Sequence, residues 1–209
     1  MPSSPAMTAA SPLARSKALS LPNILTYGRL LAVPAVVALL FWPKDDWTRW
    51  PALAIFIAAG VTDYLDGYFA RLYAQQSTLG RMLDPIADKL LVAACLMMLV
   101  YAGTIEDQHV LAAIVILCRE ILVSGLREFL AQLKVSVPVS RIAKWKTVLQ
   151  MVAVGFLIAG PAGEVILPAT TAIGLVLLWI AAMLTIYTGW DYLKAGIKVV
   201  VGEEGSWRT

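Results

Sequence analysis

Four aspartates stand close together in a chain that is otherwise strongly apolar: Asp63, Asp66, Asp84 and Asp88. All four lie within or between segments apolar enough to cross a membrane. An aspartate at the centre of a membrane helix costs about 2.5–3.5 kcal/mol on insertion scales, and repulsion between neighbouring carboxylates adds to that cost. We therefore expect these carboxylates to bind cations.

The ligand type narrows the choice of cation. Carboxylate oxygens select hard divalent ions, Mg²⁺ first, with Mn²⁺ and Ca²⁺ as alternatives. Zinc is disfavoured because the only histidine, His109, is expected at the opposite membrane face. Two ions bridged by carboxylates suit phosphoryl transfer, in which they hold phosphate oxygens and neutralise developing charge.

The first two aspartates are expected on one face of a helix. At about 100° per residue, Asp63, Asp66, Gly67 and Ala70 share an arc of about 100°. This face presents two carboxylates beside two residues with almost no side chain. A nucleotide would have room to approach the helix backbone there, and Arg71 would meet its phosphate.

The other two aspartates are expected at the start of the next helix. Asp84 is predicted as the N-cap and Pro85 as the first helical residue. Asp88 then projects from nearly the same side one turn later. Taken alone, Asp84 is typical of a cap, Asp66-Gly67 of a turn and an Asp–Arg pair of an interfacial ion pair. The combination on two adjacent helices favours a functional site.

The remaining sequence predicts an all-α integral membrane protein. Of 209 residues, 59% are hydrophobic and only 15% are charged, whereas a soluble domain carries about 25% charged residues. Apolar runs long enough to cross about 30 Å of hydrocarbon predict a six-transmembrane-helix bundle. The expected spans are about 24–42, 50–70, 85–103, 109–131, 142–160 and 168–193. The fifth reaches spanning length only if "RIAKWK" (141–146) begins the same helix.

A single catalytic domain is predicted at 23–200. It would follow a flexible tail and juxtamembrane segment at 1–22 and precede a short C-terminal tail at 201–209. Within the first segment, Leu13 to Leu21 is expected to form a short interfacial helix with basic residues on its wet face. Cys95 and Cys118 fall inside spans and are expected to be buried, reduced thiols.

The distribution of lysine and arginine predicts an orientation. Most of them lie in the tails or near the connections on the side of the N-terminus, whereas the opposite loops hold only Lys44 and Arg49. The positive-inside rule then puts both termini and the aspartates on the cytoplasmic side. No basic run alternates with aromatic residues in an exposed segment, so nucleic acid is not an expected partner.

Basic residues inside the fourth and fifth spans indicate a second substrate. Arg119, Lys144 and Lys146 would form a pocket for an acceptor that carries a phosphate, with Arg127 eight residues beyond Arg119. Headgroup anchoring is the simpler interpretation of the two lysines and Arg127, but Arg119 lies too deep to reach the interface. Pairing of these arginines with Glu120 or Glu128 stays open.

The segment "DYLDGYFARLYAQQSTLGRMLDPIAD" (63–88) resembles the signature of the CDP-alcohol phosphatidyltransferase family, without a gap. Three further segments resemble the branch of this family that uses glycerol 3-phosphate. They are "PNILTYGRLLAVP" (22–34), "CREILVSGLRE" (118–128) and "AKWKTVLQM" (143–151).

The resemblance implies a six-helix enzyme with the CDP-alcohol phosphotransferase fold that works as a homodimer in the lipid bilayer. Such an enzyme moves the phosphatidyl group of CDP-diacylglycerol to glycerol 3-phosphate and releases CMP. The resemblance also implies two Mg²⁺ ions, with Mn²⁺ as an alternative. The implied metal ligands are Asp63, Asp66, Asp84 and Asp88, with Asp88 also the general base, and the implied CDP-diacylglycerol contacts are Asp66, Gly67, Arg71 and Ser77.

Other functions stay open at this point. Inositol phosphate, serine or phosphatidylglycerol as acceptor would use the same aspartates with a different basic pocket. A divalent cation transporter would also carry carboxylates inside a bundle, although the acidic residues here form no line across the membrane. A non-catalytic scaffold would tolerate Asp88→Asn. The expected location is a bacterial cytoplasmic membrane, with the mitochondrial inner membrane as the alternative.

Overall fold

The computed structural model describes residues 21–42, 46–73, 78–133 and 141–206, but not the side chains at 21–23, 64–82, 84–85, 141–144, 195 and 199–206. Within these ranges the chain is helical and no strand is found. The helices are α2 (Leu21–Phe41), η1 (Asp46–Thr48), α3 (Arg49–Tyr73), α4 (Thr78–Tyr101), α5 (His109–Gln132), α6 (Arg141–Glu164) and α7 (Thr170–Ser206). The predicted all-α class is confirmed.

Each predicted apolar segment lies in one of the six long helices. In the part of the chain that the structure describes, four helices contain a stretch long and apolar enough to cross a membrane. These stretches are Ile24–Phe41, His109–Gln132, Trp145–Glu164 and Thr170–Lys198. Helices α3 and α4, which carry the aspartates, are not among them. Residues 13–20 of the predicted interfacial helix lie outside the described ranges, and Leu21, its last residue, begins α2.

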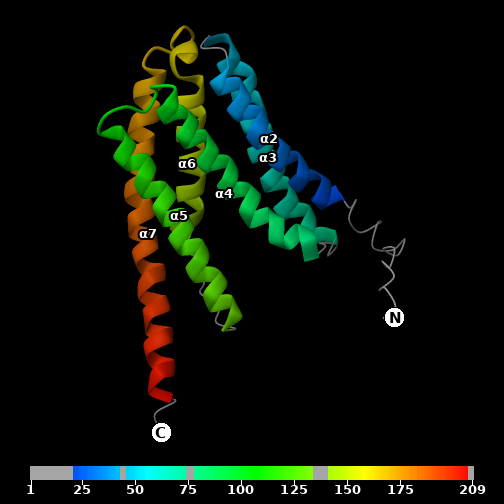
Figure 1. The fold of residues 1–209 in the computed structure, drawn as a ribbon, viewed down its shortest axis with the longest axis vertical. Coiled ribbons are helices and arrows are strands. Elements are labelled where there is room, and N and C mark those ends of the chain that lie inside the picture. Colours follow the sequence, from blue (N-terminus) through cyan, green and yellow to red (C-terminus); the bar gives the residue numbers. More distant parts are fainter. Residues whose placement is uncertain (1–20, 43–45, 74–77, 134–140, 207–209) are drawn as a thin grey trace, which may run out of the picture.

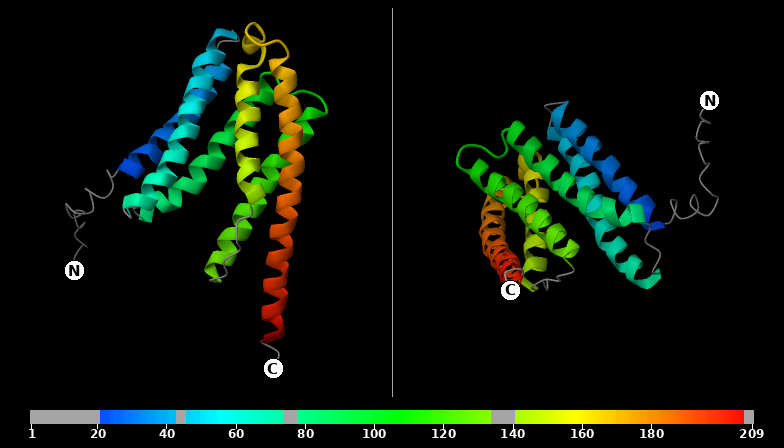
Figure 2. Two further views of the ribbon diagram at one scale, coloured as in Figure 1. Left: turned by 180° about the vertical axis from the view of Figure 1, so that it is seen from behind. Right: turned by 60° about the horizontal axis from the view of Figure 1, so that its bottom comes forward.

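The helices form two groups (Figure 1). Helix α2 packs along α3 and α4, while α6 and α5 pack along α7. Contacts between α3 and α6 join the two groups, and the view from behind in Figure 2 shows the same division. We call the end that holds the connections after α2, α4 and α6 the far end, and the opposite end, where α3 ends and α4 begins, the site end.

One apolar core extends through both groups. Each long helix contributes fully buried side chains to it, among them Val36, Phe56, Leu96, Ile116, Leu157 and Leu178. Because water is absent from the hydrocarbon region, the helices satisfy their backbone groups internally while the core fixes their packing. The fold therefore holds the side chains of the site end on rigid elements.

Helix α4 begins earlier than the sequence predicted. It starts at Thr78, so the predictions of Asp84 as N-cap and Pro85 as first helical residue are wrong. Both residues lie inside the helix. A proline inside a membrane helix is tolerated when neighbouring groups satisfy the carbonyl that it leaves unpaired, so Pro85 does not mark the helix start.

The other boundaries agree better with the sequence. Helix α6 starts at Arg141, which confirms that "RIAKWK" begins the same helix as the fifth apolar segment. Helix α7 runs for 37 residues to Ser206, well past the predicted end at 193. Cys95 is buried as predicted, but the prediction for Cys118 is wrong because this thiol is exposed on α5.

Candidate active site

An apolar cleft runs between α3 and α6 and ends at two aspartates. The cleft has a volume of about 690 Å³ and is lined by residues of α3 from Trp50 to Asp63 and of α6 from Thr147 to Gly163. Nearly all of these side chains are apolar. The charged side chains of the lining are Asp63 on α3 and Asp88 on α4, at the site end. The cleft therefore suits a ligand with a long apolar part and a polar head.

Asp63 is held by an arginine of a third helix. Nη1 of Arg29, on α2, lies 2.6 Å from Oδ1 of Asp63. The Arg29 side chain is 1% exposed, whereas that of Asp63 is 47% exposed. The sequence reasoning gave Arg29 no role, although an arginine within an apolar span is itself a signal of a functional site. This pair leaves Asp63 oriented from one side and open to the cleft on the other.

Asp88 lies among charged groups from several helices. Those that act on its carboxylate are Asp63, Arg29, Glu120 and Lys89. Asp63 and Asp88 thus present oxygen atoms to one cleft from adjacent helices. Two carboxylates in this position repel each other, and a hard divalent cation between or beside them would remove that repulsion. The donor chemistry present fits such an ion.

The rest of the predicted metal and nucleotide site is not described. The side chains of Asp66, Arg71 and Asp84, and the surroundings of Gly67, lie outside the described residues, as does the whole of Ser77. Among the side chains that are described, no three histidine, cysteine, aspartate or glutamate residues form a group able to hold a metal. That result covers only two of the four predicted ligands.

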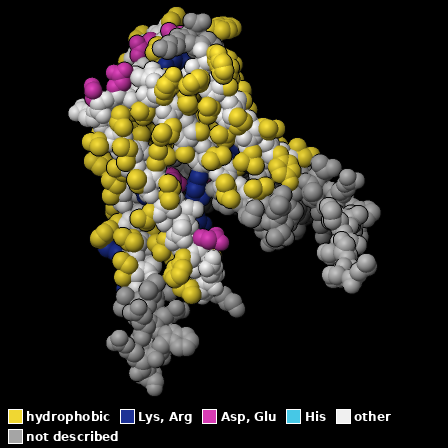
Figure 3. Space-filling model, in the orientation of Figure 1, with side chains coloured by type: hydrophobic (Ala, Val, Ile, Leu, Met, Phe, Trp, Pro, Cys, Tyr) yellow, Lys and Arg dark blue, Asp and Glu magenta, His cyan; other side chains and the backbone are white. Residues whose placement is uncertain are grey.

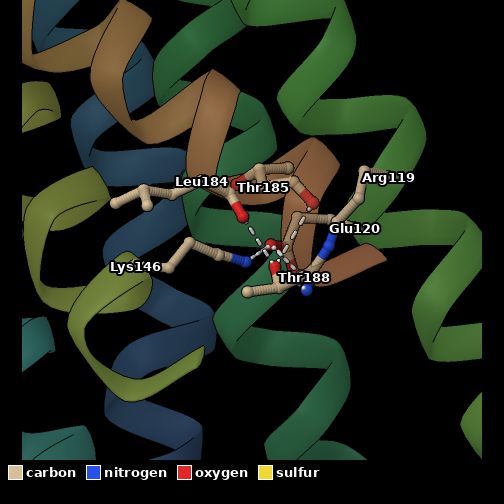
Figure 4. A network of polar contacts seen from close by, with 6 residues as sticks. All are labelled: Arg119, Glu120, Lys146, Leu184, Thr185 and Thr188. Carbon is tan, nitrogen blue, oxygen red and sulfur yellow. Dashed lines mark hydrogen bonds and ion pairs between the residues drawn. The ribbon is translucent and has the colours of Figure 1, made fainter. Parts of the chain in front are cut away.

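A second polar cluster joins α5, α6 and α7 (Figure 4). Nη1 of Arg119 donates a hydrogen bond of 3.0 Å to Oε1 of Glu120, and Nζ of Lys146 donates to the same oxygen. Nη2 of Arg119 donates to Oγ1 of Thr188 over 3.0 Å, and Thr188 donates to the Leu184 carbonyl. The structure thus brings Arg119 and Lys146 together, and Glu120, one of the two open alternatives, lies between them.

This cluster carries an excess of positive charge in a buried place. The Lys146 side chain is only 4% exposed, and Glu120 is the one carboxylate that it shares with Arg119. Among the described residues, Nε of Arg119 finds no hydrogen-bond partner. The charged groups acting on Lys146 also include Asp88. An anion bound at Arg119 and Lys146 would therefore interact electrostatically with Asp88, the candidate general base.

Close packing against α7 directs Arg119. A Cβ atom at Gly189 would lie 3.1 Å from Cγ of Arg119, so the absence of a side chain at Gly189 lets the arginine lie across this helix. The sequence reasoning did not identify Thr188 or Gly189. Only the packing of α5 on α7, which joins residues 69 positions apart in the chain, reveals them.

Of the remaining predicted residues, those whose side chains are described lie apart from this cluster. Arg127 and Glu128 are exposed, and Arg127 lies about 12 Å further along the axis of α5 than Arg119. The side chain of Lys144 is outside the described residues. His109 begins α5 at the far end and accepts a 3.0 Å hydrogen bond at Nδ1 from Nε1 of Trp179. Its predicted position away from the aspartates is confirmed.

Comparison with known proteins agrees with this geometry. Residues 19–187 match the sequence profile of the family described as CDP-alcohol phosphatidyltransferase. Three relatives are each named CDP-diacylglycerol--glycerol-3-phosphate 3-phosphatidyltransferase, the Arabidopsis thaliana protein with the added number 2. The chain is 47% identical to the Rickettsia typhi protein over 84% of this chain and 96% of the relative. It is 39% identical to the Cereibacter sphaeroides protein over 88% and 99%, and 40% identical to the Arabidopsis thaliana protein over 89% and 83%. The chain belongs to the CDP-alcohol phosphatidyltransferase family.

Proposed function

We propose that the chain transfers the phosphatidyl group of CDP-diacylglycerol to glycerol 3-phosphate, giving phosphatidylglycerophosphate and CMP. The apolar cleft that ends at Asp63 and Asp88 carries this proposal. A lipid with two acyl chains and a diphosphate head matches a cleft with an apolar length and an ion-binding end. The names of the relatives support the same reaction.

The donor's head group would bind at the site end. We propose two Mg²⁺ ions, with Mn²⁺ as the alternative, held by Asp63, Asp66, Asp84 and Asp88. Bound there, the ions would supply positive charge to the diphosphate oxygens. Arg29 would keep Asp63 turned toward the cleft through their ion pair. The proposed contacts of the cytidine diphosphate part are Asp66, Gly67, Arg71 and Ser77.

Asp88 would act as the general base. Its carboxylate accepts the proton of an acceptor hydroxyl, and the hydroxyl oxygen forms a new bond to the phosphorus of the phosphatidyl group. The bond between that phosphorus and the oxygen of CMP breaks, and CMP leaves with the bonding electron pair. Position matters more than basicity here, because Asp88 lies at the end of the cleft where the phosphorus would sit.

The basic cluster would bind the acceptor's phosphate. Arg119 and Lys146 offer charge-assisted hydrogen bonds, and Glu120 neutralises only one of the two positive charges. Lys144 and Arg127 complete the proposed set, with Arg127 the more distant. Serine carries no phosphate and no net charge, and the cations would repel its ammonium group. This difference favours glycerol 3-phosphate or inositol phosphate within the family.

The chain is an integral membrane protein with four strongly apolar helices, and we propose that α3 and α4 also cross the membrane. With 25 and 24 residues, each is about 36 Å long and exceeds the hydrocarbon thickness of about 30 Å. Residues 23–200 would form one catalytic domain. We further propose a homodimer in a bacterial cytoplasmic membrane, with the mitochondrial inner membrane as the alternative.

The orientation proposal rests on charge. Figure 3 shows hydrophobic side chains over much of one face, with acidic side chains gathered near the far end. Glu106, Asp107 and Glu164 are exposed at that end. Of the predicted cytoplasmic lysines and arginines, the described ones are Lys146, Lys194 and Lys198, and they lie toward the other end. On this charge difference, both termini and the active site would face the cytoplasm.

A cation transporter is the competing class. The cleft beyond Asp63 is lined by apolar side chains as far as Trp50 and Leu167. Among the lining residues a transported ion would meet no charged side chain along that length, which counts against transport.

The first test is CMP release by the purified protein in mild detergent with Mg²⁺ and CDP-diacylglycerol. Glycerol 3-phosphate, inositol phosphate and serine are offered separately. We expect CMP release with glycerol 3-phosphate, and a chelator should abolish it. Asp88→Asn should lower the rate of CMP release about 10²–10⁴-fold while its thermal unfolding stays unchanged. No release from folded protein with any acceptor would contradict the proposal.

A second arm tests the acceptor site. Arg119→Gln is expected to raise the KM for glycerol 3-phosphate about tenfold or more while the KM for CDP-diacylglycerol changes little, because a charge-assisted contact is lost. Lys198→Gln, which removes one positive charge from an exposed position on α7, is the matched control. Equal effects of both variants would contradict a specific phosphate site.

A further inference from the structure

Helix α6 breaks near its far end. Gly160 has φ 42° and ψ −128°, and Pro161 follows it. Proline has no N–H, so the Leu157 carbonyl loses its helical donor. The non-helical Gly160 also lies within the turn that would pair the Ile158 carbonyl. Carbonyl groups left unpaired at membrane depth are unfavourable, so this break needs other donors.

Arg49 supplies donors to the break. Its Nη1 lies 3.4 Å from the Leu157 carbonyl oxygen and 3.3 Å from that of Ile158, and its Nη2 donates to Oγ1 of Thr104 over 2.9 Å. A Cβ atom at Gly160 would lie 2.7 Å from Nη1 of Arg49, so a side chain there would displace the guanidinium, and the positive φ of Gly160 itself favours glycine. Arg49 therefore ties the start of α3 to the connection after α4 and to the break in α6.

The break lies beside the end of the cleft that is farthest from Asp63 and Asp88. Ala159 and Gly163, on either side of Gly160-Pro161, both line it, and so do Trp50, next to Arg49, and Leu167. Trp50 lies thirteen positions before Asp63 on α3, which corresponds to about 20 Å along the helix axis. Half of a hydrocarbon core of about 30 Å is about 15 Å. The cleft is therefore deep enough to take a whole acyl chain from one leaflet.

We propose that Arg49 is a positioning residue that fixes this end of the cleft, that a bound acyl chain stops there, and that this closed end selects the donor lipid by acyl chain length. The proposal rests on the proposed function, because it assigns the cleft to the acyl chains of CDP-diacylglycerol. The methyl end of a bound chain lies beside Trp50, and its phosphate end lies at Asp63 and Asp88.

Tryptophan fluorescence tests the placement without turnover. The full-length protein in detergent is titrated with CDP-diacylglycerol brominated either near the methyl ends or near the carboxyl ends of its acyl chains. The difference between the wild type and Trp50→Phe isolates the Trp50 signal. We expect quenching of Trp50 by methyl-end bromines and little quenching by carboxyl-end bromines. Equal quenching by both lipids, or none by either, overturns the proposal.

Chain-length selectivity tests the function of the closed end. Ala159→Leu adds bulk to the end of the cleft. We expect it to raise the KM for a dipalmitoyl donor about tenfold or more, and to raise the KM for a dioctanoyl donor far less. The matched control is Ala54→Leu, at an exposed position of α3 outside the cleft lining. An Ala159→Leu variant that treats both donors as the wild type does overturns the proposal.

Variants of Arg49 test the positioning role itself. Arg49→Gln is expected to shift selectivity in the same direction and to increase hydrogen exchange in α6 around Gly160. Arg49→Lys, which keeps a cationic donor, is expected to recover part of both effects. If the wild type releases CMP with both donors but no variant changes the selectivity for acyl chain length, only this inference is overturned. Wild-type protein that releases no CMP with either donor would instead contradict the proposed function.

Discussion

The ion pair between Arg29 and Asp63 joins an almost fully buried guanidinium to a half-exposed carboxylate. A buried arginine is stable in an apolar bundle only when its charge and donors are satisfied. Asp63 meets that need and is itself held near Asp88. The pair therefore has two roles, since it stabilises the contact of α2 with α3 and orients a predicted metal ligand.

Removing one partner of this pair is expected to be worse than removing both. Arg29→Gln leaves Asp63 beside Asp88 without its guanidinium, and we expect a loss of about 1–3 kcal/mol, below the 3–5 kcal/mol of a fully buried pair because Asp63 is partly solvated. Thermal unfolding in detergent should show Arg29→Gln combined with Asp63→Asn to be more stable than Arg29→Gln alone. Strictly additive losses would mean that the two side chains do not interact.

At the scale of helices, the length of each apolar run was enough to locate all six long elements. The start of α6 was also predicted, because its apolar part is long enough to span the membrane only if the basic turn before it belongs to the same helix. The start of α4 did not follow, because Asp84-Pro85 has the local pattern of a helix start and yet lies inside α4. A local residue pattern therefore indicates the start of a helix only when the residues before it do not themselves favour a helix.

Contacts between helices were beyond the reach of sequence reasoning. The aspartates on α3 and α4 were recognisable from their types and spacing, but the pairing of Arg29 with Asp63 depends on how α2 packs on α3. In the same way, Glu120 binds both Arg119 and Lys146 only because α5 and α6 bring them together. Arg49 was counted as a loop charge, whereas it serves the break in α6.

The contact of α6 with α7 depends on a glycine. A Cβ atom at Gly174 would lie 2.9 Å from Cγ and 3.2 Å from the backbone N of Leu157. Gly174→Ala is therefore expected to destabilise the protein by about 1–3 kcal/mol through overpacking. Gly125→Ala is the matched control, since nothing lies within 4 Å of its Cβ position, and it should be neutral or stabilise by up to about 1 kcal/mol. If Gly174→Ala unfolds at the same temperature as the wild type or higher, the close contact of α6 with α7 does not contribute to stability.

Across the whole molecule, the two ends differ in charge and in task. The far end holds acidic connections and the Arg49 contacts with the break in α6, while the site end holds Asp63, Asp88 and the basic cluster. A donor lipid lying along the cleft would thus present its head group at one membrane face only. Access of the water-soluble acceptor then depends on which compartment that face meets.

Cysteine labelling in sealed right-side-out vesicles tests this orientation. Gln108→Cys adds a thiol at an exposed far-end position, and Lys198→Cys adds one on α7, about 42 Å along the helix from Thr170 and so beyond the hydrocarbon region. Both variants carry Cys118→Ser to remove the exposed native thiol. A membrane-impermeant maleimide should label Gln108→Cys in intact vesicles and Lys198→Cys only after the vesicles are opened, because the basic site end is held in the cytoplasm. The reverse pattern would put the aspartates outside, where glycerol 3-phosphate and CDP-diacylglycerol made in the cytoplasm would not reach them together.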